Sequence, residues 1–134
     1  MKKRVFFIVL SILLMAMIFY FSDMPASQSS AVSKPVAKSV GLSDSEMRKI
    51  AHFICFACLS GSLYGLFNTF KKIRFPKVAA FLTTVLYAVT DEFHQSFVPG
   101  RSCELRDVLI DSSGALVLLL LLLAFEAFFR RKRT

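Results

Sequence analysis

The stretch Asp91-Glu92-Phe93-His94-Gln95 is followed by Phe97-Val98-Pro99-Gly100-Arg101 and then by Glu104-Leu105-Arg106-Asp107. Apolar runs lie on both sides of these residues, which we call the central motif (residues 91–107). The motif holds four carboxylates, two guanidinium groups and one of the two histidines of the chain. Ionisable groups close to membrane depth are costly and usually serve a function. We therefore expect the functional site to lie here.

Long apolar blocks surround the central motif. Hydrophobic residues make up 55% of the chain, and they are grouped in continuous runs, as in membrane proteins. A helix needs about 20 apolar residues to cross about 30 Å of hydrocarbon. We therefore predict an all-α fold, an integral membrane bundle that forms a single domain over residues 1–134. Its four transmembrane helices are expected at about residues 5–21, 50–70, 76–97 and 104–129.

The basic residues predict how this bundle is oriented. Eleven of the seventeen Lys and Arg residues lie before the first span, between the second and third spans, or after the fourth. Four crossings put these segments on one side of the membrane, and the positive-inside rule then makes both termini cytoplasmic. The net charge of +8 thus follows the topology, and nucleic-acid binding is not indicated. His52 and the central motif are expected together on the extracytoplasmic face.

The segment between the first two spans contains helix-breaking and helix-starting signals. Pro25 and Pro35 predict an irregular outer loop over residues 22–41. Ser43 and Glu46 then form a capping-box pattern, which predicts a helix that begins outside the bilayer and enters it near Ile50. We expect the first span to be retained, because its apolar core is longer than the roughly 7–15 residues of a signal peptide.

Helical spacing predicts which faces of the spans meet. Ala57, Gly61 and Gly65 recur every four residues and predict close contact with a neighbouring helix, while His52 lies on nearly the opposite face. We therefore expect the second span to have neighbours on both sides. Polar residues spaced three, four and three apart predict two facing stripes on the last two spans. These stripes are Thr84, Tyr87, Asp91 and His94, and Glu104, Asp107, Asp111 and Gly114.

The central motif resembles that of the VanZ-like family of small bacterial membrane proteins, named after an accessory protein of teicoplanin resistance. The resemblance extends to Lys49-x-x-His52-Phe53 and to Phe21-Ser22 with the loop that follows. The chain departs from the expected pattern at Asp111, where Asn is expected, and at Cys103-Glu104. The resemblance implies a multi-pass protein of the bacterial cell membrane with a role in the envelope and in glycopeptide resistance, but it implies no reaction.

Three interpretations of the polar residues remain open. One is a membrane enzyme acting on a lipid-linked phosphate at the outer leaflet, with a histidine as base and Arg101 on the phosphate. The second is a binding or interaction protein in which Asp91–Arg101 and Glu92–Arg106 pairs hold the bundle together. The third is a metal site, with Asp91 and His94 as candidate ligands. The candidate catalytic residues are His52, Asp91, Glu92, His94 and Asp107, and the candidate binding residues are Lys49, Gln95, Arg101, Arg106 and Asp111.

The expected partners follow from these interpretations. Membrane lipid is one, and a lipid-linked precursor of the cell envelope is another. No cofactor is expected, and the sequence does not indicate whether the chain forms homo-oligomers.

Overall fold

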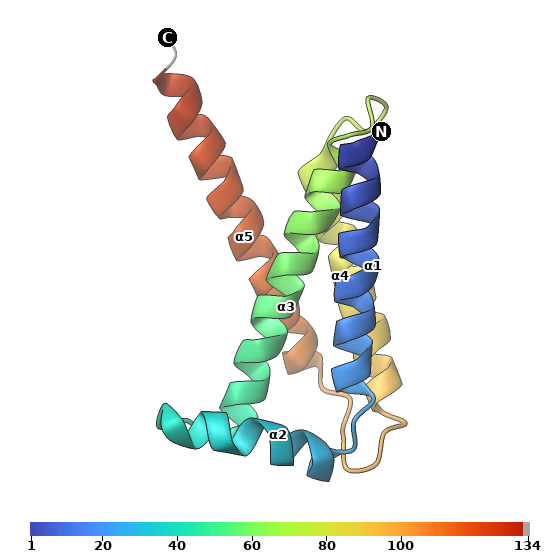
Figure 1. Ribbon diagram of the computed structural model, residues 1–134, viewed down its shortest axis with the longest axis vertical. Helices are drawn as coiled ribbons and strands as arrows, with labels where there is room; N and C mark the ends of the chain where they lie inside the picture. Colours follow the sequence, from blue (N-terminus) through green and yellow to red (C-terminus); the bar gives the residue numbers. More distant parts are fainter. Residues whose placement is uncertain (133–134) are drawn as a thin grey trace.

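The computed structural model describes residues 1–132, and all the regular structure in that range is helical. The helices are α1 (Lys2–Ser22), α2 (Ala26–Ser39), α3 (Asp44–Phe67), α4 (Pro76–Gln95) and α5 (Leu105–Arg131). Helices α1, α3 and α4 run side by side, α5 crosses α3 and then diverges, and α2 lies across one end of the bundle (Figure 1). The N-terminus and the last turns of α5 lie at the opposite end (Figure 1). We call these the α2 end and the terminal end.

Helix α3 is the centre of the bundle. It packs against α1, α2, α4 and α5, which confirms the prediction of neighbours on both of its sides. Its buried Phe56, Leu59 and Leu63 form a core with Ile18 of α1 and with small alanines of α4. At the terminal end a polar contact supplements this core. The Tyr64 hydroxyl and the Lys77 ammonium of α3 and α4 both donate to the carboxylate of Glu126 in α5, each over 2.6 Å.

Glycines set the closest approaches between helices. A Cβ atom at Gly114 of α5 would collide with the backbone carbonyl of Phe53 in α3, so only glycine fits this crossing. A Cβ atom at Gly61 would lie 2.7 Å from a methyl group of Leu118 in α5, and one at Gly65 would collide with the Phe7 ring of α1. The predicted small-residue stripe therefore serves two neighbours rather than one.

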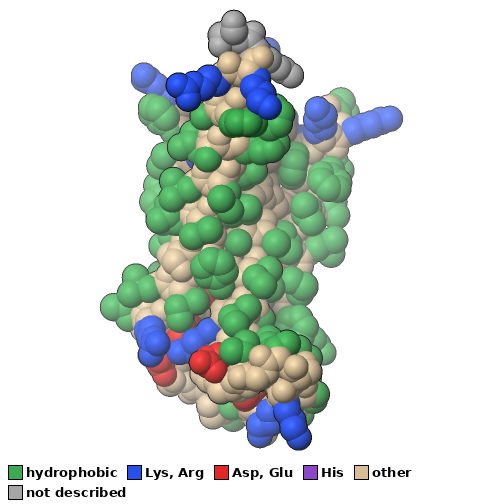
Figure 2. Space-filling model, turned by 90° about the vertical axis from the view of Figure 1, so that its left-hand side faces the viewer, with side chains coloured by type: hydrophobic (Ala, Val, Ile, Leu, Met, Phe, Trp, Pro, Cys, Tyr) green, Lys and Arg blue, Asp and Glu red, His purple; other side chains and the backbone are tan. Residues whose placement is uncertain are grey.

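Three helices, α1, α3 and α5, are long and apolar enough to cross a membrane. Helix α4 is not among them, because its last turns carry Asp91, Glu92 and Gln95 on its buried side. Figure 2 shows hydrophobic side chains covering the middle of one face, with Lys and Arg gathered toward both ends. Arg133, which belongs to the predicted basic tail, lies outside the described residues.

The prediction of an irregular loop over residues 22–41 is wrong, because residues 26–39 form α2. Pro25 stands at the N-cap, where its missing N–H costs nothing, and Pro35 is accommodated inside the helix. Tertiary contacts hold α2 in place: the hydroxyls of Ser30 and Ser33 both donate to the Asp44 carboxylate at the start of α3. Local sequence rules do not register contacts of this kind.

The predicted helix boundaries are otherwise shifted by a few residues. The capping box is confirmed, since the Ser43 N–H donates to Glu46 over 2.8 Å and the Glu46 N–H donates to the Ser43 hydroxyl over 3.2 Å. Helix α3 ends at Phe67 rather than near residue 70, and α4 ends at Gln95 rather than near residue 97. The chain then turns at Gly100, whose φ of 74° suits glycine.

Candidate functional site

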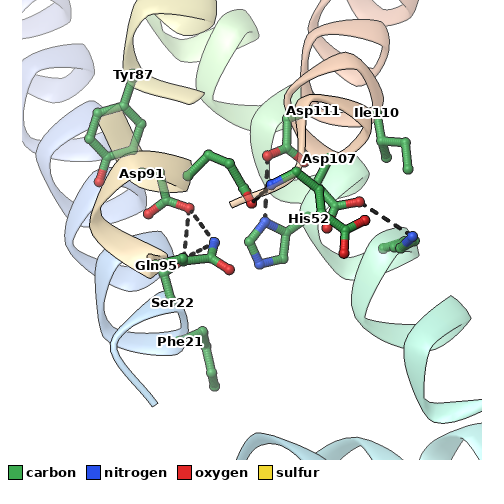
Figure 3. A network of polar contacts seen from close by, with 12 residues as sticks. Phe21, Ser22, His52, Tyr87, Asp91, Gln95, Asp107, Ile110 and Asp111 are labelled. Carbon is green, nitrogen blue, oxygen red and sulfur yellow. Dashed lines mark hydrogen bonds and ion pairs between the residues drawn. The ribbon is translucent and has the colours of Figure 1, made fainter. Parts of the chain in front are cut away.

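Polar side chains from α1, α3, α4 and α5 gather at the α2 end of the bundle (Figure 3). A pocket of about 140 Å³ opens among α3, α4, the 96–104 loop and α5, and we call it the polar pocket. Charges of both signs line it. The basic residues are Arg48, Lys49 and Arg101, and the acidic residues are Glu92, Glu104, Asp107 and Asp111. Ser45, His52, Gln95 and Ser102 are the other polar residues that line it.

Asp91 ties α1 to α4 beneath the polar pocket. Its side chain is buried, and its Oδ2 accepts hydrogen bonds from the Ser22 hydroxyl (2.7 Å) and the Gln95 amide (3.0 Å). The same amide lies 3.3 Å from the Ser22 oxygen, which closes a three-membered network (Figure 3). These bonds satisfy Oδ2, whereas the other oxygen of Asp91, Oδ1, is buried without a donor among the described residues. Asp91 therefore joins two helices, and Gln95 separates it from the polar pocket.

Arg101 fixes the end of α1 against the loop that follows α4. Its guanidinium donates to the carbonyls of Phe21 (3.0 Å) and Met24 (3.2 Å) and to the Gln95 side-chain oxygen (3.2 Å). Burial lowers the pKa of the Arg101 guanidinium, although arginine remains charged. The predicted direct Asp91–Arg101 pair is wrong, because Gln95 lies between the two and bonds to both. One amide thus links the buried acid to the arginine.

Helix α5 contributes carboxylates that face α3. Asp111 is only 1% exposed, and its Oδ2 lies 3.6 Å from Nδ1 of His52. Its other oxygen, Oδ1, is buried and has no hydrogen-bond donor among the described residues. One turn earlier, Asp107 forms an ion pair with Lys49 over 3.3 Å. Two acid–base pairs therefore cross from α5 to α3 at the wall of the polar pocket (Figure 3).

Glu92 closes the pocket from the side of α4. It is 2% exposed, and its carboxylate accepts a hydrogen bond of 2.8 Å from the backbone N–H of Glu104. This bond satisfies a donor at the start of α5. The predicted Glu92–Arg106 pair is wrong, because Arg106 lies exposed on the outer side of α5. Glu92 thus positions α5 rather than neutralising an arginine.

A second, apolar pocket of about 290 Å³ lies between α1, α2 and α3. Its wall includes Met17 and Ile18 of α1, Val32 and Val36 of α2, and Met47 of α3. Three residues line both this apolar pocket and the polar pocket: Arg48, His52 and Arg101. The two cavities therefore adjoin at these three residues, two of which are arginines.

The structure brings most of the predicted site residues together. The predicted residues that line the polar pocket are Lys49, His52, Glu92, Gln95, Arg101, Asp107 and Asp111. Asp91 lies behind Gln95, whereas His94 lies outside both pockets, where its Nε2 is 3.1 Å from Asp23 and its ring packs on Phe19. Arg106 also lies outside them.

Sequence reasoning missed Arg48 and the contribution of α2, and it placed Glu104 in the central motif without naming it as a candidate site residue. Arg48 precedes His52 by four residues and therefore shares its helix face, a spacing that could have identified it. Val32 and Val36 show the same spacing within a segment rich in Ser.

The described residues provide no third ligand for the metal site predicted at Asp91 and His94. Within residues 1–132, no three His, Cys, Asp or Glu side chains are grouped so that they could hold a metal ion. The two candidate ligands have different partners, Asp91 with Ser22 and Gln95, and His94 with Asp23.

The comparison with known proteins identifies the family. The family model described as VanZ/LLP1 matches residues 7–127, a range that includes both pockets and most of every helix. No curated protein and no solved structure matches the chain. The family match agrees with the resemblance of the central motif and covers far more than half of the sequence. The chain therefore belongs to the VanZ/LLP1 family of membrane proteins.

Proposed function

We propose that this protein binds an amphiphile of the bacterial cell membrane, either a lipid or a lipid-linked precursor of the cell wall. The observation that carries the proposal is the contact between a polar and an apolar pocket at Arg48, His52 and Arg101. An amphiphile needs an apolar groove next to a few well-placed polar groups. The headgroup would occupy the polar pocket and the acyl or prenyl chain the apolar pocket.

The orientation belongs to the same proposal. Helix α4 joins the terminal end to the α2 end, and at about 1.5 Å per residue its 20 residues extend about 30 Å. We therefore count α4 as the fourth span. The even number of crossings and the basic residues of the terminal end support cytoplasmic termini. Both pockets would then open at the extracytoplasmic face, toward the outer leaflet.

The family gives this binding a biological setting. The resemblance to a teicoplanin-resistance accessory protein supports a contribution to glycopeptide resistance through an envelope lipid. A deletion strain should then become more susceptible to teicoplanin, and the wild-type gene should restore resistance. Unchanged susceptibility in the deletion strain would contradict the resistance role but not lipid binding.

Binding can be tested with the purified full-length protein in detergent and a pyrene-labelled phospholipid. Ala51 of α3 lines the apolar pocket, so Ala51→Phe should fill part of it and weaken binding about tenfold, equivalent to about 1.4 kcal/mol. Ala127→Phe, on the exposed surface of α5 outside both pockets, is the matched control and should bind like wild type. Equal affinities for the two variants would refute the location of the site.

A second candidate function rests on the contact between His52 and Asp111. A histidine whose Nδ1 faces a carboxylate can serve as an oriented general base, and Arg101 lies in the same pocket. Water would attack the terminal phosphorus of a polyprenyl diphosphate while His52 accepts its proton. The bond from this phosphorus to the bridging oxygen would break, so that polyprenyl monophosphate leaves and inorganic phosphate is released. Incubation with a polyprenyl diphosphate tests this candidate: release of phosphate that is lost in His52→Gln supports it, and no release by the wild type excludes this reaction.

A further inference from the structure

The residues that line the two pockets also bear on which headgroup is bound, and this inference rests on the proposed function. We infer that the pockets select a phospholipid with a small zwitterionic headgroup, in which a phosphate is followed by a primary ammonium group, as in phosphatidylethanolamine. The acyl chains would lie in the apolar pocket, the phosphate at the boundary between the pockets, and the ammonium group at the acidic wall formed by α5.

The boundary between the pockets suits a phosphate. A guanidinium group has five N–H donors, and Arg101 uses three of them on neutral acceptors among the described residues, which leaves two. Arg48, which also lines both pockets, has one ion pair among residues 1–132, a long contact of 3.8 Å with Asp44. In a phospholipid the phosphate lies between the chains and the terminal group, so it would meet both arginines where the pockets join.

The far wall of the polar pocket suits an ammonium group. Asp111 is 1% exposed and lines the pocket, yet its Oδ1 has no donor among residues 1–132. Buried carboxylate oxygens are normally hydrogen-bonded, and a primary ammonium group offers three N–H donors. Asp107 and Glu104 line the same side and add negative charge. A trimethylammonium group carries no N–H and would leave Asp111 unsatisfied.

Charge and size favour the same headgroup. Four acidic and three basic side chains line the pocket, so a purely anionic headgroup would meet more like than opposite charge. The polar pocket measures about 140 Å³. A protein cavity of about 150 Å³ accommodates benzene, a molecule of six heavy atoms. A phosphoethanolamine group is of comparable size, whereas the sugar–peptide headgroup of a cell-wall precursor is far larger.

Competition between lipids tests the inference on the full-length protein in detergent. Pyrene-labelled phosphatidylethanolamine is bound first, and unlabelled phosphatidylethanolamine, phosphatidylglycerol or phosphatidylcholine is then added. We expect phosphatidylethanolamine to compete about tenfold better than the other two. Equal competition by all three, or stronger competition by either of the others, would overturn the headgroup inference and leave lipid binding intact. No saturable binding of the labelled lipid would overturn phospholipid binding itself and would leave only the lipid-linked precursor of the proposed function.

Variants then test which residue binds the ammonium group. Asp111→Asn should bind lipid but lose the preference for phosphatidylethanolamine over phosphatidylglycerol. Asp23→Asn makes the same change at the α2 end but outside both pockets, so it should keep the preference. If Asp111→Asn does not fold, Asp107→Asn takes its place and should at least halve the preference. A folded variant of either aspartate that keeps the full preference would overturn the assignment to this wall.

Discussion

At the scale of single residues, the site depends on a few side chains that connect helices rather than on one reactive group. Gln95 bonds to Asp91 with its amide nitrogen and to Arg101 with its oxygen, and Arg101 in turn holds the carbonyls at the end of α1. The sequence pointed to all three residues but not to their connection. Spacing along one helix does not show which acceptor a flexible arginine in the next loop will reach.

Arg101→Ala should destabilise the folded protein. It removes three hydrogen bonds from a charged donor to the Phe21 and Met24 carbonyls and to Gln95. Bonds to charged groups contribute about 1.5–3 kcal/mol each, but water can reach this half-buried side chain, so we expect a total loss of about 2–4 kcal/mol. Thermal unfolding in detergent measures it. The control is Arg106→Ala at an exposed position, expected within about 0.5 kcal/mol of wild type. Equal melting temperatures would contradict the structural role of Arg101.

The two histidines should differ in ligand binding. His52 lines both pockets and faces Asp111, whereas His94 packs on Phe19 beside Asp23 outside them. His52→Gln should therefore weaken binding of the labelled lipid by about tenfold, while His94→Gln should change it less than about twofold. Glutamine keeps a hydrogen-bonding side chain but cannot titrate near neutral pH. A stronger effect of His94→Gln would place the site on the outer side of α4.

At the scale of helices, the crossing of α3 and α5 fixes the pocket wall that holds Asp107 and Asp111. Gly114 follows Asp111 by three residues and lies against the Phe53 carbonyl, one residue after His52. This tight approach to the backbone of α3 is therefore next to the acid–base pair of the pocket. Small residues allow such approaches in membrane helices.

Gly114→Ala should be more harmful than Gly61→Ala. The added methyl group at position 114 meets rigid backbone, whereas at position 61 it meets the movable end of the Leu118 side chain. Overpacking typically lowers the free energy of unfolding by about 1–3 kcal/mol. We therefore expect a loss of about 3 kcal/mol or more for Gly114→Ala and of about 1 kcal/mol or less for Gly61→Ala. Thermal unfolding of both variants, with their yield in the membrane, provides the measurement. A larger effect at Gly61 would contradict the described crossing.

Helix α2 marks the limit of sequence reasoning at this scale. The apolar runs predicted the four long helices, and the capping box predicted the start of α3, because both signals are local. The formation of α2 depends on Ser30 and Ser33 reaching Asp44, which is a contact between elements. The apolar pocket was missed for the same reason, since α2 forms one of its walls. Proline content describes the segment alone and not the surface on which it packs.

At the scale of the whole molecule, counting the crossings predicted which residues could meet. His52 and the central motif were expected together, and the structure places His52 and part of the motif around the polar pocket, with His94 and Arg106 outside it. Among the described helices, three are long and apolar enough to cross a membrane, and α4 is not one of them. It is the helix that carries Asp91, Glu92 and Gln95 into the bundle, and these residues reduce its apolar character. The side chains that form the site thus lower the hydropathy of the helix that carries them.

Cysteine labelling tests the topology as a whole. Cys55, Cys58 and Cys103 are replaced first, and single cysteines are then introduced at Ser30 in α2, Asn68 after α3 and Ser102 before α5. Positions 30 and 102 belong to the α2 end, and position 68 lies at the other end of α3 (Figure 1). With cytoplasmic termini, an impermeant thiol reagent should label 30 and 102 in intact cells, and 68 only after permeabilisation. Labelling of 68 alone would invert the orientation and turn both pockets toward the cytoplasm. Labelling of 30 and 68 together would mean that α3 does not cross the membrane.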